Sequence, residues 1–156
     1  FMFEILISYP KKEEEIKIVK STTAGTETPV KPVLSAADIL NIQDIIRRIP
    51  VSDHVVTYAT DIVRATRPKE SESPDFVKEW VAWGAGPRAA QYLVLGAKAK
   101  AAINGRYNVS VNDVKSMCHP VLRHRIFTNF NADSEGIDAD SIVDKLLKTI
   151  QEPQYK

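Results

Sequence analysis

The 156-residue sequence has one cysteine, little net charge and no long apolar run. Cys118 alone cannot form an internal disulfide and gives no sign of an oxidising compartment, so we expect a cytoplasmic protein. The formal net charge of +1 provides no strong field to attract nucleic acid or an anionic membrane. No apolar run is long enough to span a bilayer. The length suits one domain, or one domain with an attached fragment, and a sizeable core.

Motifs of catalysis and metal binding are also missing. None of the six glycines is followed by lysine, so the chain has no phosphate-binding loop and should not hydrolyse ATP alone. It has no nucleophilic serine elbow. His54, His119 and His124 lack the spacing of metal ligands, so we expect no metal site. Cys118 is expected on the apolar face of a helix beside Met117, which disfavours a reactive thiol.

The beginning of the chain predicts a strand and a helix. Residues 1–7 are apolar and β-branched, as in a strand, and Pro10 with the acidic residues 13–15 predicts a helix. A lone strand is not stable, so we expect a piece of a longer protein, cut before a strand of an upstream sheet. Residues 21–34 lack apolar periodicity and contain Pro29 and Pro32, which predicts a loop and a domain boundary.

The remaining sequence predicts a bundle of five or so helices, and therefore a mainly α fold. Ser35 with Asp38 three residues later is a variant of the capping box, and Ser52 and Ser110 are expected to cap two further helices. Proline is expected to end two of the helices, and Asn104-Gly105 a third. The expected starts are Ser35 (ending before Pro50), Ser52, a short turn at 76–81, Pro87, Ser110 (ending at Pro120) and about Asp138.

Basic residues near two helix ends have ordinary structural interpretations. Arg64 and Arg67 lie at the end of a predicted helix, where cations are favoured. Residues 121–130 alternate charged and apolar residues, which predicts a strand or extended arm. We therefore interpret the cluster at 123–125 as its solvent-facing side, in preference to a nucleic-acid patch, because the basic footprint expected for DNA is missing.

The segment Trp-Gly-Ala-Gly-Pro-Arg at 83–88 predicts the start of a helix that can bind an anion. Gly86 can serve as the N-cap, and Pro87 suits the first helical position. Arg88 then lies in the first turn, where a cation opposes the helix dipole at a cost of roughly 0.3–1 kcal/mol. An anion between its guanidinium and the free amides would remove this penalty. A solvated surface arginine is the alternative.

Three sets of residues resemble the C-terminal part of MoxR-type AAA+ ATPases, in order and over nearly the whole chain. The first resembles the last strand of the ATPase core and the helix after it. The second joins Arg-Ala-Thr-Arg-Pro to the anion-receiving helix start. In order along the chain, the sets are 1–14; 63–68 with 83–90; and 105–107, 111–114 and 120–126.

The resemblance implies a helical lid that closes over ATP bound to an upstream α/β core. Residues 1–20 would be the tail end of that core, 21–34 a linker and 35–156 the lid. Gly86, Pro87 and Arg88 match the sensor-2 motif, so Arg88 would contact the γ-phosphate of ATP in its own subunit. The family usually has serine where Gly86 stands, and glycine is also a competent cap.

The resemblance further implies ring oligomers, usually hexamers, with chaperone-like action, often on partners with von Willebrand factor A domains. The phosphate loop, the Walker B acid, the arginine finger and the Mg-binding groups would lie before Phe1. The fragment alone should therefore be inactive and hold no cofactor. The rival interpretation is a helical protein-interaction or nucleic-acid-binding module without a nucleotide role.

Overall fold

A computed structural model of the chain describes residues 1–25 and 29–153, and these form eight helices and one two-stranded sheet. The mainly α fold is confirmed. Residues 26–28 of the expected linker and 154–156 of the expected lid lie outside the described residues. The elements are α1 Lys12–Thr23, α2 Ala36–Arg48, α3 Asp53–Ala65, α4 Asp75–Trp80, β1 Val81–Trp83, α5 Pro87–Ile103, α6 Val111–Leu122, β2 Phe127–Thr128, α7 Phe130–Glu135 and α8 Ala139–Thr149.

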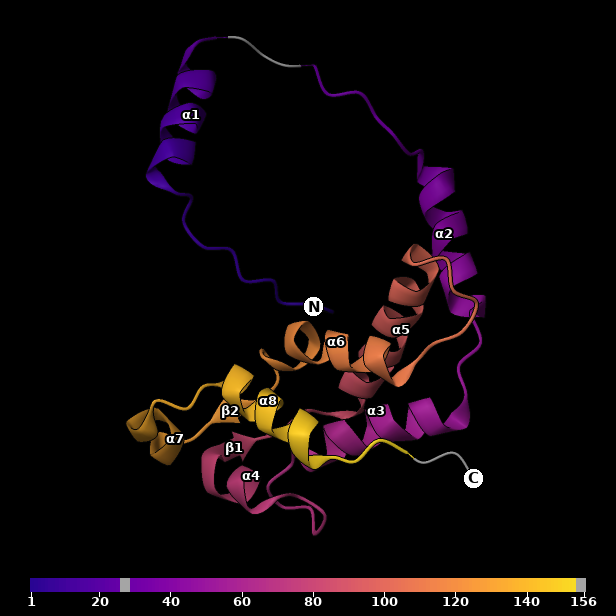
Figure 1. Ribbon diagram of the computed structural model, residues 1–156, viewed down its shortest axis with the longest axis vertical. Helices are drawn as coiled ribbons and strands as arrows, with labels where there is room; N and C mark the ends of the chain where they lie inside the picture. The colour runs from indigo at the N-terminus through magenta and orange to yellow at the C-terminus, as the bar shows by residue number, and fades with distance from the viewer. Residues whose placement is uncertain (26–28, 154–156) are drawn as a thin grey trace.

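Helix α5 lies at the centre of the bundle, packed against α6, α3 and α2 (Figure 1). Small residues form much of its buried face, including Ala97 and Ala101. Gly96 marks a close approach, because a Cβ built there would lie 3.0 Å from Sδ of Met117. Helix α8 completes the core by packing on α6 and α3. The predicted helix at Pro87 and its end at Asn104-Gly105 are confirmed.

The strand or extended arm expected at 121–130 is confirmed only at Phe127–Thr128; the rest of the region begins in a helix, turns at 123–125 and ends at the start of another helix. Helix α6 continues to Leu122, β2 has only two residues and Phe130 begins α7. The Asn129 side chain accepts a hydrogen bond from the Ala132 amide at 3.1 Å, which caps α7. Strand β2 pairs antiparallel with β1, which the sequence did not indicate.

Pro120 does not end the helix that Ser110 begins. The Ser110 cap is confirmed, but Pro120 lies inside α6. A proline within a helix removes one backbone donor and disfavours the preceding turn. Here it falls in the last turn, and the Arg123 amide still bonds to the His119 carbonyl at 3.1 Å. The chain therefore completes the turn after the proline.

The first eleven residues form no strand in the structure, so the prediction of a strand at 1–7 is wrong. A strand needs a partner backbone to share its hydrogen bonds. Within the described residues, this segment has one such backbone bond, from the Glu4 amide to the Pro120 carbonyl at 2.8 Å. The helix expected after Pro10 is confirmed as α1. Neither α1 nor α2 has a buried residue, and Figure 1 shows α1 apart from the bundle.

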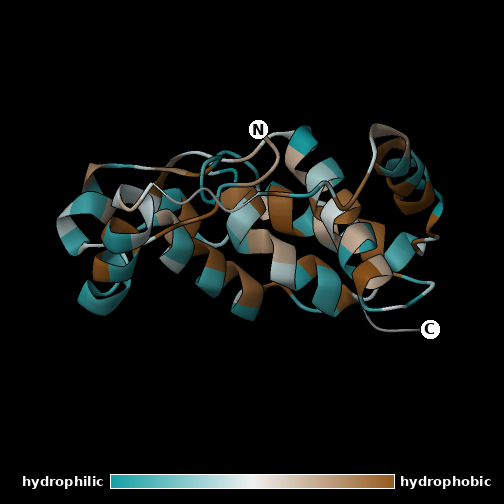
Figure 2. Ribbon diagram, turned by 90° about the horizontal axis from the view of Figure 1, so that it is seen from above, coloured by the Kyte–Doolittle hydropathy of each residue, from teal (hydrophilic) through white to brown (hydrophobic). Residues whose placement is uncertain are grey.

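The helices of the bundle are amphipathic. Figure 2 shows their ribbons banded in brown and teal, so that hydrophobic and hydrophilic residues recur along each one. The buried face of α3 consists of Val55, Tyr58, Ala59, Ile62, Val63 and Ala65, whereas Val56 is exposed. None of the helices in residues 1–25 and 29–153 has the length and apolar character needed to cross a membrane.

Candidate functional site

The start of α5 has the geometry expected of an anion-receiving helix end. Gly86 occupies the N-cap position with an extended backbone, and Pro87 is the first helical residue. Glycine has no side chain to bond the amides of the first turn, and this turn contains no acidic residue. The positive end of the helix dipole is therefore uncompensated by the local sequence.

Arg88 lies in the first turn of α5 and is exposed. Within the described residues it forms no hydrogen bond or ion pair. If its guanidinium were buried or held by a neighbouring carboxylate, Arg88 would not be a candidate for binding an anion from outside the chain. The sensor-2 role expected for Gly86, Pro87 and Arg88 stays a prediction. Their positions at the start of α5 are compatible with it.

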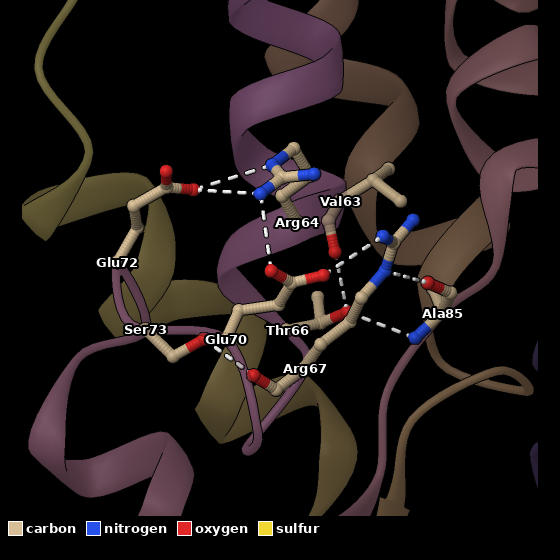
Figure 3. Close-up of polar contacts among 8 residues, drawn as sticks. All are labelled: Val63, Arg64, Thr66, Arg67, Glu70, Glu72, Ser73 and Ala85. Carbon is tan, nitrogen blue, oxygen red and sulfur yellow. Dashed lines mark hydrogen bonds and ion pairs between the residues drawn. The ribbon is translucent and has the colours of Figure 1, made fainter.

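The loop that leads into α5 is held against the end of α3 (Figure 3). The hydroxyl of Thr66 accepts a hydrogen bond from the Ala85 amide at 2.8 Å, and Nε of Arg67 donates to the Ala85 carbonyl at 3.0 Å. Thr66 and Ala85 are both buried. The two backbone polar groups of Ala85 are thus satisfied by two adjacent residues, which is how a buried loop meets its hydrogen-bonding needs.

Ion pairs surround this contact (Figure 3). Arg64 bonds to Glu70 and Glu72, in each case at 3.1 Å from its Nη2, and Arg67 lies 3.4 Å from the same Glu70. The hydrogen bond to Glu72 and the charge of Glu70 raise the pKa of Arg64. Both side chains therefore have partners within the fold, which agrees with the structural interpretation of Arg64 and Arg67.

A pocket of about 500 Å³ opens beside this loop. Its lining includes Arg67, Lys69, Glu70 and the loop itself from Trp83 to Pro87. Trp83 is 68% exposed, so an aromatic ring stands at the surface close to the helix start. The arrangement places mixed charge and one aromatic face next to the first turn of α5.

The basic cluster at 123–125 was expected to face solvent, but its two arginines bind groups of the chain itself. Arg123 is only 17% exposed and pairs with Asp140 at 3.0 Å. Arg125 lies over the Tyr92 ring and donates to backbone carbonyls of Val121, Phe1 and Met2. The interpretation was wrong because α6 reaches Leu122, which directs these side chains onto the chain's own first residues.

The remaining candidate groups lie away from the α5 start. Cys118 is completely buried, and this burial raises the pKa of its thiol to about 12. The residues that the structure describes contain no cluster of three or more histidine, cysteine or carboxylate side chains suited to a metal ion.

Sequence reasoning did not identify the contact between Thr66 and the loop at Gly84 and Ala85. A Cβ at Gly84 would lie 2.2 Å from the carbonyl oxygen of Thr66, so the two backbones touch. Thr66 and Ala85 are 19 positions apart. The only signal was that both stretches, 63–68 and 83–90, carried the family resemblance.

Comparisons with known proteins support that resemblance. Residues 75–146 match the family model of the AAA lid domain. The chain is 34% identical to Chaperone MoxR1 of Mycobacterium tuberculosis over 99% of its length, and 26% identical to YeaC of Bacillus subtilis over 98%. It superposes with a TM-score of 0.88, at 29% identity and over 99% of its length, on the crystal structure of a candidate ATPase from Cytophaga hutchinsonii.

The chain spans less than half of each of these proteins. It covers 41% of Chaperone MoxR1, 45% of YeaC and 47% of the chain from Cytophaga hutchinsonii. The match to the AAA lid model includes α4 to α7 and most of α8, and therefore the whole start of α5. The fold, the whole-chain identity and the family match agree: residues 75–146 are an AAA lid domain, and the chain corresponds to the lid-containing part of a MoxR-type AAA+ ATPase.

Proposed function

We propose that this lid couples ATP binding and hydrolysis to chaperone-like remodelling of partner proteins, with Arg88 as its nucleotide sensor. The single observation that carries the proposal is the start of α5 within the matched lid domain. Arg88 is exposed there and forms no bond with the described residues, beside amides that no side chain caps. The name of the relative Chaperone MoxR1 supports the chaperone-like part.

The residues at this helix start fit the terminal phosphate of a nucleotide and little more of it. A guanidinium and the first amides of a helix are donors that suit a phosphate, whereas the rest of ATP and its Mg would be held by groups outside this chain. ATP supplies the phosphoryl group whose charge Arg88 would contact. When that group leaves, the contact is lost, and the lid is free to move.

The assembly follows from the family. We propose that the complete protein forms a ring of identical subunits, usually six in this family, in which the lid packs on an ATPase core. Partners with von Willebrand factor A domains are the proposed class of client. We place the complete protein in the cytoplasm, as expected from the cysteine usage of this chain.

The test is ATP turnover by the complete ATPase with Arg88→Ala. Loss of a charge-assisted contact typically costs about 1.5–3 kcal/mol, so turnover should fall roughly tenfold or more. Arg88→Lys should give an intermediate rate, because lysine keeps the charge and loses the planar fork.

The matched control is Arg48→Ala, which removes another exposed arginine, on α2. Among the residues that the structure describes, Arg48 pairs only with Asp44 of its own helix. Its turnover should stay within about twofold of the unmodified enzyme, as expected for an exposed pair. Unchanged turnover in Arg88→Ala would remove the sensor assignment and leave the interaction-module interpretation.

A further inference from the structure

We propose that Thr66 and Arg67 are positioning residues for Arg88, because together they hold both backbone polar groups of Ala85. We call the three residues Thr66, Arg67 and Ala85 the Ala85 clasp. The inference rests on the proposed function of Arg88 and adds how the fold fixes its position. Ala85 directly precedes the N-cap Gly86, so any shift of the clasp moves the first turn of α5.

Thr66 provides the buried half of the clasp. Its side chain is fully buried, its hydroxyl donates to the Val63 carbonyl at 2.6 Å, and it accepts from the Ala85 amide at 2.8 Å. A hydroxyl is required here, since it must donate and accept at once. Valine has almost the same shape, but it would leave the buried Ala85 amide without a partner.

Arg67 provides the half-buried side of the clasp. Its Nε donates to the Ala85 carbonyl at 3.0 Å, while one of its terminal nitrogens lies 3.4 Å from Glu70. Its own carbonyl accepts a bond from the hydroxyl of Ser73, which is buried. The direction of the guanidinium is therefore set from two sides, and lysine could not reproduce the Nε bond.

Gly84 shows how tightly the two segments approach. The space that its Cβ would occupy is filled by the backbone of Thr66, with the carbonyl oxygen at 2.2 Å. Backbone atoms, unlike a flexible side chain, cannot turn away. The loop therefore has little freedom to slide along the end of α3, and the position of α5 follows the position of Thr66.

The Ala85 clasp connects the end of α3 with the start of α5, which lie 18 or 19 positions apart in the sequence. The end of α3 is part of the buried core, whereas Arg88 is exposed three residues after Ala85. A long side chain reaches a phosphate productively only when its base is held, since a displacement of about 1 Å can cost a hundredfold in rate. Thr66 and Arg67 supply that hold through their bonds to Ala85.

The experiment is a set of ATP turnover measurements on the complete ATPase with Thr66→Val, Thr66→Ser, Arg88→Ala and the double variant Thr66→Val/Arg88→Ala. Thr66→Val should lower turnover about fivefold to tenfold, and Thr66→Ser, which keeps the hydroxyl, should stay within about twofold. In the Arg88→Ala background, Thr66→Val should change turnover by less than about twofold, because residues that act through one group are not additive.

A second pair of variants keeps the test decisive if Thr66→Val does not fold. Arg67→Lys keeps the charge beside Glu70 and loses the bond to Ala85, so turnover should fall about threefold or more, again only when Arg88 is present. Arg64→Lys is the matched control, since Arg64 belongs to the same ion-pair cluster and has no bond to Ala85. Its turnover should stay within about twofold.

The outcomes separate this inference from the proposed function. If Arg88→Ala lowers turnover and Thr66→Val does not, the clasp has no positioning role. If Thr66→Val costs the same factor with and without Arg88, it acts through the general stability of the lid, and the inference is also overturned. If Arg88→Ala leaves turnover unchanged, the sensor proposal itself fails, and there is no group for the clasp to position.

Discussion

Two helices of this protein begin with the same capping box in very different surroundings. Ser35 and Asp38 start α2, and Ser110 and Asp113 start α6, with reciprocal side chain to backbone bonds in both. Asp38 is exposed, whereas Asp113 is 3% exposed and also binds Arg106 through two bonds of 2.6 and 2.7 Å. Local sequence produces the motif in both regions, and only packing makes one of them part of a core.

The difference extends to the whole of the two regions. Helices α1 and α2 are well formed but bury no residue, and apolar side chains such as Ile16, Leu40 and Ile45 are exposed. From α3 onward the apolar stripes face one another and form a continuous core. Amphipathic pattern and caps are therefore enough to place a helix, while most of the stability comes from what its apolar face meets.

The largest contrast should come from one substitution made in both regions. Leu93→Ala in α5 removes a completely buried side chain and should lower the free energy of unfolding by about 2–5 kcal/mol. Leu40→Ala in α2 removes a side chain that is 65% exposed, and should cost less than about 0.5 kcal/mol. Urea unfolding of the chain measures both, and equal losses would contradict the division into a region with buried side chains and a region without them.

The two capping boxes should also differ when each carboxylate is replaced. Asp113→Asn removes the ion pair with Arg106 and should destabilise the chain by about 1–3 kcal/mol, since the remaining amide is poorly suited to the buried site. Asp38→Asn affects only an exposed cap, so its effect should be clearly smaller. Thermal unfolding of the two variants provides the comparison, and a larger loss in Asp38→Asn would reverse it.

The smallest of the expected effects is the loss of stability in acid, which should be larger for the carboxylate of Asp113 than for that of Asp38. The bonds from Arg106 lower the pKa of Asp113 from 3.8 to about 2. A carboxylate with a lowered pKa stabilises the fold above its unfolded value, and this contribution disappears as the pH falls towards the folded value. After allowance for the exposure of Arg106, roughly 1–2 kcal/mol should be lost between about pH 5 and pH 2.

The Asp113→Asn variant is the control for this acid effect. It should lose less stability over the same pH range, because asparagine does not titrate. Asp38→Asn should stay closer to the unmodified chain, because the bonds from Ser35 lower the pKa of a carboxylate that is exposed to solvent. Unfolding curves recorded at several pH values measure the difference. The same pH slope in Asp113→Asn and the unmodified chain would show that other carboxylates are responsible.

Much of the fold could be predicted because its signals are local. The caps at Ser35, Ser110 and Asp138 all form, and Pro87 begins α5 as expected. Failures occurred where the outcome depended on distant residues. The strand at 1–7 has no partner strand in the described chain, and Pro120 is tolerated because only the last turn of α6 follows it.

In the candidate site, too, local features could be predicted from the sequence and distant contacts could not. Gly86, Pro87 and Arg88 could be placed at a helix start from their own order, because cap and first-turn preferences are local. The grip of Thr66 and Arg67 on Ala85 could not, since a hydrogen bond across 18 or 19 positions depends on how α3 and α5 pack. Arg125 failed for the same reason, because its partners include Phe1 and Met2 at the other end of the chain.

By itself, the amino-acid sequence determined where most of the helices begin, the mainly α character of the chain and an arginine in the first turn of a helix with no side-chain cap. These follow from interactions within a few residues. The tertiary structure alone decided which apolar faces are buried, which arginines are bound within the fold and how the loop before α5 is held. Those outcomes depend on contacts between segments far apart in the chain, which no local pattern encodes.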